Sequence, residues 1–183
     1  MDSSRRRFLA GAAVTLGMSA GCVSSTGEQS SGAASLEETV TVSGLDVVVD
    51  EFLTAPALTE TEDRGGDRIT PPDGAMHLLV HVRYENNSET RKEPAMKSEA
   101  RLLYRGQEAE TGDVGFDDRV LVDGTEYTAY QHGYRDENWI YPGNSFEGWL
   151  FYVVPEGFEA SEAVVEIEVE TEEKDVAAGW RLA

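Results

Sequence analysis

Strict alternation of apolar and polar residues is the feature that most limits the folds open to this chain. It is clearest in the segment 75–87, AMHLLVHVRYENN. Successive side chains of a β-strand point to opposite faces, so a period of two residues predicts a strand with one buried face. The segment 163–171, AVVEIEVET, alternates in the same way. The face of 75–87 that we expect to be buried carries Met76, Leu78, Val80, Val82 and Tyr84.

Further segments from about residue 38 to the C-terminus also have the composition of short strands. They are 39–53, which Gly44 divides, 98–106, 119–124, 126–131, 146–155 and 177–183. Gly and Pro separate these segments, as expected for turns. The segment 146–155 is apolar on both faces and is therefore expected in the middle of a sheet. About seven or more short strands without a long helix predict an all-β fold, an immunoglobulin-like β-sandwich.

The N-terminus has the pattern of an export signal. Three adjacent arginines precede an uncharged apolar stretch that is too short for a membrane-spanning helix, which needs about 20 apolar residues. The residues that match the twin-arginine motif S-R-R-x-F-L are Arg5, Arg6, Phe8 and Leu9. Residues 1–21 therefore resemble a signal peptide of the twin-arginine type, which implies export of the already folded protein.

Cys22 is the only cysteine, and it follows this segment directly. The sequence SAGC that ends at Cys22 resembles a lipobox, in which lipid alkylates the thiol, except that Ser19 stands where leucine is usual. The Ser- and Gly-rich composition that follows predicts a flexible tether over 22–37, before a folded domain over 38–183. The expected location is the outer face of the cell membrane, with the membrane bound through lipid on Cys22.

The chain is strongly acidic, with 35 Asp and Glu against 15 Lys and Arg and a formal net charge of −20. Removal of residues 1–21 would make the charge more negative still, because three arginines and one aspartate would leave. Excess acid with few lysines resembles the proteins of salt-loving archaea, in which salt screens the self-repulsion. A nucleic-acid partner is excluded, since the sequence has no basic patch to neutralise phosphates.

Two stretches of the body resemble a known family. They are 77–112, which contains HVRYENNSE and LLYRG, and 141–169, which contains YPGNSFEGWLFYVVPE. Both are similar to the telokin-like, immunoglobulin-like domain of the DUF4352 type, found in many bacterial and archaeal lipoproteins. The resemblance implies a sandwich outside the cell and carries no set of catalytic residues. The insert 54–74 and the segment 119–139 are less family-like.

Few side chains are candidates for chemistry. His77 and His81 share one face of their strand but lie about 13 Å apart, too far to share one zinc ion. We favour exposed positions on an outer sheet face for both, although either could approach His132. The acidic loop 112–124 matches no EF-hand, so no catalytic residue, metal site or cofactor is predicted. Asn86 heads an Asn-Asn-Ser acceptor sequence and is a candidate for glycosylation.

The most unusual stretch is 126–144, EYTAYQHGYRDENWIYPGN, which spaces aromatic residues among polar ones. Aromatic side chains with polar tips give contact area at low entropy cost and are common at binding surfaces. The alternative is that these rings cap one end of the sandwich. The candidates for a ligand or partner surface are Tyr127, Tyr130, Tyr134, Trp139 and Tyr141.

These features together predict a lipid-anchored, extracytoplasmic binding module rather than an enzyme. Its partner would be an envelope protein or a small ligand. Two alternatives stay open: a hydrolase that uses a metal or acidic carboxylates, and a structural spacer without a ligand. A pocket that gathers His, Asp and Glu would favour the hydrolase, and an aromatic patch without such a pocket favours binding.

The variant Cys22→Ser tests the lipid anchor. It lacks the thiol that would carry the lipid, so we expect the exported chain to leave the membrane fraction. Ultracentrifugation of lysed cells measures this, with Ser24→Ala as a control that should sediment like the unaltered chain. A processed Cys22→Ser chain that still sediments with membranes would contradict the anchor.

Overall fold

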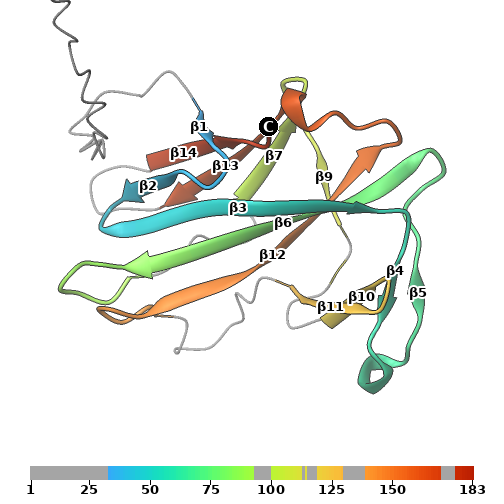
Figure 1. Cartoon of the computed structure of the whole chain (residues 1–183), viewed down its shortest axis with the longest axis horizontal. Coiled ribbons are helices and arrows are strands. Elements are labelled where there is room, and N and C mark those ends of the chain that lie inside the picture. The colour runs from blue at the N-terminus through green and yellow to red at the C-terminus, as the bar shows by residue number, and fades with distance from the viewer. Residues whose placement is uncertain (1–32, 93–99, 113, 115–118, 130–138, 170–175) are drawn as a thin grey trace, which may run out of the picture.

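Three β-sheets make up the part of the chain that the structure describes. The computed structural model describes residues 33–92, 100–112, 114, 119–129, 139–169 and 176–183. Residues 1–32, which include the predicted signal and Cys22, lie outside this part. Three long strands, β3 (Leu45–Ala55), β6 (Ala75–Asn86) and β12 (Ser145–Pro155), run side by side across the middle of the molecule (Figure 1). The sheet that contains β13 (Ala163–Val169) and β14 (Val176–Arg181) lies near the C-terminus, and the sheet that contains β4 (Leu58–Glu60) and β10 (Arg119–Val122) lies at the opposite end.

The central sheet has the strand order β2-β3-β6-β12-β9. Its strands are β2 (Thr39–Val42), β3 (Leu45–Ala55), β6 (Ala75–Asn86), β12 (Ser145–Pro155) and β9 (Glu110–Thr111). The second sheet contains, in order, β1 (Ala34–Ser35), β14 (Val176–Arg181), β13 (Ala163–Val169), β7 (Ala100–Tyr104) and β8 (Gln107–Glu108). The third sheet contains β11 (Thr125–Thr128), β10 (Arg119–Val122), β4 (Leu58–Glu60) and β5 (Arg68–Ile69). Two short 3₁₀ helices are η1 (Glu62–Arg64) and η3 (Ala160–Glu162).

The second sheet covers one face of the central sheet and forms the main core with it. The even-numbered side chains of β6 from Leu78 to Tyr84 are buried there, as the alternation predicts. β13 and β14 contribute Val165, Ile167 and Trp180 from the opposite side. Each fully buried aliphatic side chain stabilises the fold by roughly 1.5–3 kcal/mol. This packing confirms the predicted all-β sandwich.

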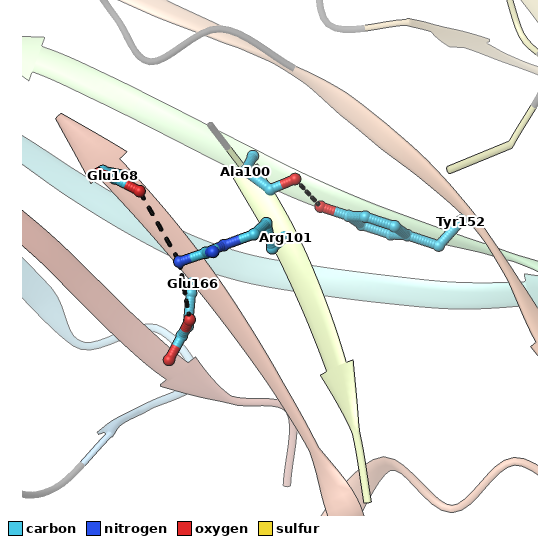
Figure 2. A network of polar contacts seen from close by, with 5 residues as sticks. All are labelled: Ala100, Arg101, Tyr152, Glu166 and Glu168. Carbon is cyan, nitrogen blue, oxygen red and sulfur yellow. Dashed lines mark hydrogen bonds and ion pairs between the residues drawn. The ribbon is translucent and has the colours of Figure 1, made fainter. Parts of the chain in front are cut away.

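A hydrogen bond crosses this core and joins the two sheets. The Tyr152 hydroxyl of β12 donates to the carbonyl oxygen of Ala100 in β7 at 3.1 Å (Figure 2). Burial raises the pKa of this phenol, so the group stays a donor. The next residue, Arg101, points to the other face of β7 and pairs with Glu166 and Glu168 of β13. β7 thus alternates between a buried contact and a solvated ion-pair network.

A β-bulge at Asp50 changes the register of β3 against β6. Val49 pairs with Val82 and Glu51 pairs with His81, which leaves Asp50 without a partner position. An extra residue moves every later side chain to the opposite face. Odd-numbered residues therefore point into the main core before the bulge and away from it afterwards. A single period of two cannot describe the whole strand.

The third sheet packs on the other face of the central sheet. Its strands come from 54–74 and 119–139, the two segments that are least family-like. The two segments are neighbours in the folded chain, and β10 of one pairs antiparallel with β4 of the other. A second, smaller core lies beneath this sheet and consists of Ala55, Leu58, Leu79, Val114, Val120, Ala129 and Phe151. The long strands of the central sheet are thus buried on both faces where the third sheet covers them, whereas Arg83, Glu85 and Glu147 on the same face are exposed.

Ordered pairing begins slightly before the expected domain start at residue 38. Ala34 and Ser35 pair in parallel with Trp180 and Arg181 of β14. The indole N–H of Trp180 also donates to the carbonyl oxygen of Glu38 at 2.8 Å. These contacts hold the end of the expected tether against the sandwich. No helix in the described part of the chain is long and apolar enough to span a membrane.

Candidate functional site

Asn86 organises a corner of the sandwich where β6 ends and β12 begins. Its side chain is fully buried, and its amide nitrogen donates to the carbonyl oxygens of Ile140 at 2.6 Å and Thr90 at 2.8 Å. The side-chain oxygen accepts from the backbone N–H and the hydroxyl of Ser88. All the hydrogen-bonding capacity of this amide nitrogen is therefore used to join three chain segments.

This geometry corrects the expectation of a glycan at Asn86. Attachment of a sugar replaces one hydrogen on the side-chain nitrogen and needs access to it. Both hydrogens here are donated to carbonyl oxygens, that of the buried Ile140 and that of Thr90, and none of Asn86 is exposed. The acceptor sequence is present, but its asparagine has a structural role in the folded domain.

Backbone bonds make the corner rigid on both sides of Asn86. Lys92 and Ile140 exchange two backbone hydrogen bonds of 2.9 and 2.7 Å. The N–H of Gly143 donates to the carbonyl oxygen of Asn86, and the N–H of Asn144 donates to that of Tyr141. Gly143 has φ of 76°, as the second central residue of a type II turn requires. The predicted Pro-Gly turn is therefore in place.

The corner displays a cation and two aromatic rings. The guanidinium carbon of Arg91 lies 4.2 Å from the centre of the Trp139 ring, within the range of a cation–π interaction. Tyr141 is 54% exposed and is the only large hydrophobic side chain marked as exposed in the described residues. We name Arg91, Lys92, Trp139 and Tyr141 the Arg91 corner. Stacking fixes the plane of Arg91, so less conformational freedom is lost when its N–H groups bind a ligand.

The predicted aromatic surface is divided between two places. Trp139 and Tyr141 belong to the Arg91 corner. Tyr127 lies in β11 of the third sheet, where its ring meets Trp149 edge to face at 4.9 Å. Tyr130 and Tyr134 lie outside the described residues. Tyr127 therefore contributes to packing of the third sheet and not to an exposed platform.

A second polar cluster lies beside Tyr127 on the same side of the central sheet. The bulge at Asp50 directs its carboxylate to Nδ1 of His81, at 2.6 Å. The His81 ring in turn lies 4.9 Å from that of Trp149, tilted by 44°. Arg83 adds a longer contact of 3.7 Å to Asp50. The bulge is what makes this cluster, since bulges redirect side chains at particular positions.

The Asp50–His81 pair lacks the other parts of a hydrolytic site within the described residues. Asp50 is the one hydrogen-bond partner recorded for His81 there, so no hydroxyl nucleophile is bound to the ring. The described residues also hold no group of three or more His, Cys, Asp or Glu side chains that could bind a metal. His132 and Asp113, Asp117 and Asp118 of the acidic loop lie outside the described part. The cluster is suited to packing and hydrogen bonding.

His77 contradicts the expectation of an exposed position. It shares its face of β6 with His81, as predicted, but the third sheet leaves it 2% exposed. Neither ring nitrogen makes a hydrogen bond of ordinary geometry. Burial lowers the pKa of His77, and the nearby backbone of Ile69 opposes this only in part. The sequence could not show this, because the covering strands come from a distant insert.

Four arginines in the described part, Arg83, Arg101, Arg105 and Arg119, form ion pairs with acids. Arg105 pairs with Glu162, and Arg119 pairs with Asp63 and Glu126. These hydrogen bonds raise the pKa of both guanidinium groups. Arg91, by contrast, makes its recorded contact with a ring and forms no ion pair inside the described residues. Among the described residues Arg68 and Arg181 also form no ion pair, and Arg91 differs from them in the aromatic ring that its guanidinium contacts.

Comparison with solved structures identifies the fold. The yjhA protein from Bacillus subtilis superposes with a TM-score of 0.53 at 14% identity, over 81% of this chain and 98% of that protein. A functionally unknown protein from Listeria monocytogenes EGD-e gives 0.50 at 10% identity, over 82% and 85%. No family model and no curated protein matches the sequence. At these identities the likeness shows an all-β sandwich and nothing about the ligand.

Sequence reasoning missed the parts of the site that depend on distant contacts. Arg91 was not singled out, although its position five residues after Asn86 placed it in the same loop. Asp50 carried no signal, because a bulge is not visible in a run such as VVVDEF. The one available clue was the aromatic stretch, which includes Trp139 and Tyr141.

Asn86→Ala tests the structural role of this amide. It removes the donor to the buried carbonyl oxygen of Ile140, a loss that costs about 1–3 kcal/mol, and it also removes the part-buried bonds of the Asn86 side chain to Thr90 and Ser88. We expect the free energy of unfolding to fall by at least about 2 kcal/mol in urea titrations. Asn87→Ala is the matched control, since Asn87 is exposed and loses one bond to Asp46. An Asn86→Ala chain as stable as Asn87→Ala would show that the corner does not depend on this residue.

Proposed function

We propose that this chain is a non-catalytic binding module that is held at the outer face of the cell membrane by lipid on Cys22. The Arg91 corner is its recognition surface. The partner is an envelope protein or a small ligand, bound by aromatic contact and by the free edge of a stacked guanidinium. Export through the twin-arginine route and relationship to lipoprotein domains of the DUF4352 type belong to the same proposal.

The observation that supports the proposal most directly is that the backbone of the Arg91 corner is held by hydrogen bonds around Asn86, while the side chain of Tyr141 is exposed. Asn86 and two turns hold the backbone of the corner, whereas Tyr141 is more than half exposed. Aromatic and arginine side chains dominate the energy of most binding surfaces. A frame that is already ordered lowers the cost of ordering on binding. Packing alone gives no reason to expose a tyrosine at this point.

The N-terminal sequence supports the anchored location. The first described residues lie beside β14, and the third sheet is at the other end of the molecule (Figure 1). At most 3.3–3.6 Å per residue separates Cys22 from β1, so the tether would reach roughly 40 Å. The domain would therefore stay close to the membrane while its surfaces remain open to partners.

The described residues favour binding over the hydrolase alternative. His81 is occupied by Asp50 and lies on an aromatic ring. No recorded contact joins this pair to the Arg91 corner within the described residues. A spacer without a ligand gives no role to an arginine that lies over a ring and forms no ion pair among the described residues.

A photo-crosslinking amino acid at position 141 tests the proposal in intact cells. We expect a specific crosslinked product that disappears when Arg91→Ala is added, because the stacked guanidinium is part of the surface. Position 105 is the control, since Arg105 also lies over a ring but is neutralised by Glu162. A small ligand would appear instead as a rise in melting temperature that Arg91→Ala removes.

Two outcomes would contradict this function. Equal crosslinking from positions 141 and 105 would indicate non-specific collision. No product at 141, together with no ligand that shifts the melting temperature, would favour the spacer. Release from the membrane by Cys22→Ser is a separate observation, so the anchor and the surface can fail independently.

A further inference from the structure

His77 is a titratable side chain buried where nothing balances a charge. It projects from β6 into the layer between the central and third sheets and is 2% exposed. Its cross-strand neighbours are Ala55 in β3 and Val153 in β12. The third sheet contributes the backbone of Ile69 in β5. Among the described residues, no acid forms an ion pair with the ring and no charged side chain is among the groups that shift its pKa.

His81 provides a built-in contrast on the same face of the same strand. Its Nδ1 lies 2.6 Å from the carboxylate of Asp50, with Arg83 also contacting that carboxylate, and its ring faces Trp149. A proton on His81 therefore meets an anion and an aromatic ring. The described neighbours of His77 named above are apolar side chains and the backbone of Ile69, and an unpaired charge in such a place is strongly unfavourable.

The third sheet can open without breaking the sandwich. Its strands are inserts that leave the central sheet and return to it: β4 and β5 lie between β3 and β6, and β10 and β11 lie between β9 and β12. The main core and the second core are separate clusters. The β3–β6–β12 ladder does not pass through the inserts. Local opening of such a unit costs less than global unfolding.

We infer that the third sheet is an acid-sensitive flap, which loosens from the central sheet when His77 takes up a proton. The direction of the pH effect follows from the coupling between docking of the third sheet and proton binding at His77. Burial lowers the pKa of His77 below its ordinary value of about 6.5, so the docked form binds the proton more weakly than the open form. Docking is therefore fully favoured above the ordinary pKa and is lost as the pH falls through it towards the lowered pKa.

Amide hydrogen exchange of the full-length chain in concentrated KCl at pH 7.5 and pH 5.5 tests this device. Protection factors remove the intrinsic effect of pH on exchange. We expect protection in β4 and β10 to fall by up to about tenfold at pH 5.5, equivalent to about 1.4 kcal/mol, which is the most that one histidine with an ordinary pKa in the open form can supply. β13 serves as the internal reference for general effects of acid on the sandwich and should keep its protection.

The variants assign the effect to one ring. His77→Leu should retain protection of β4 and β10 at pH 5.5, and His77→Gln gives the same test with a neutral polar side chain if the leucine variant folds poorly. His81→Gln should still lose protection in acid. The inference is overturned if the unaltered chain keeps its third sheet docked at pH 5.5. It is equally overturned if both neutral His77 variants open as the unaltered chain does.

Discussion

The antiparallel ladder of β3, β6 and β12 is the constraint on which the rest of the structure depends. β6 is paired along its whole length on one side and along most of it on the other. The second sheet covers one face of these strands and the third sheet covers part of the other, so their side chains contribute to two separate cores. A strand buried on both faces has little freedom in register. Departures from regularity, such as the bulge at Asp50, therefore stand out as features that place particular side chains.

The sequence predicted what local alternation can encode. The long strands, the inward face of β6 and the turn at Pro142-Gly143 follow from period and from Gly and Pro positions, and the structure confirms them. The sequence predicts short strands in the segments of β10 and β11, but β4, β5 and their pairing into a third sheet could not be predicted, because β4 and β10 are short and lie about sixty residues apart. The burial of His77 was missed for the same reason. Asn86 was misjudged because an acceptor sequence says nothing about whether its amide is already hydrogen-bonded.

The candidate site was predicted in its residue types and missed in its organisation. An unusual density of tyrosine and tryptophan drew attention to 126–144, and in the structure Trp139 of this stretch contacts Arg91 while Tyr141 is exposed. The structure adds the frame: Asn86 supplies the bonds, and Arg91 supplies a cation that no acid in the described residues neutralises. On so acidic a protein, this cation marks the place on the proposed module where a partner would be attracted. The membrane anchor, if Cys22 carries it, would add only proximity to partners.

Two adjacent leucines of β6 test the central claim that the ladder is buried on both faces. Leu78 lies in the main core and Leu79 in the second core, and both are fully buried. Leu78→Ala and Leu79→Ala should each lower the free energy of unfolding by about 2–5 kcal/mol in urea titrations at high KCl. A one-sided sheet would make one of the two positions tolerant. A cost below about 0.5 kcal/mol for Leu79→Ala, the value typical of surface positions, would contradict a third sheet docked on the central one.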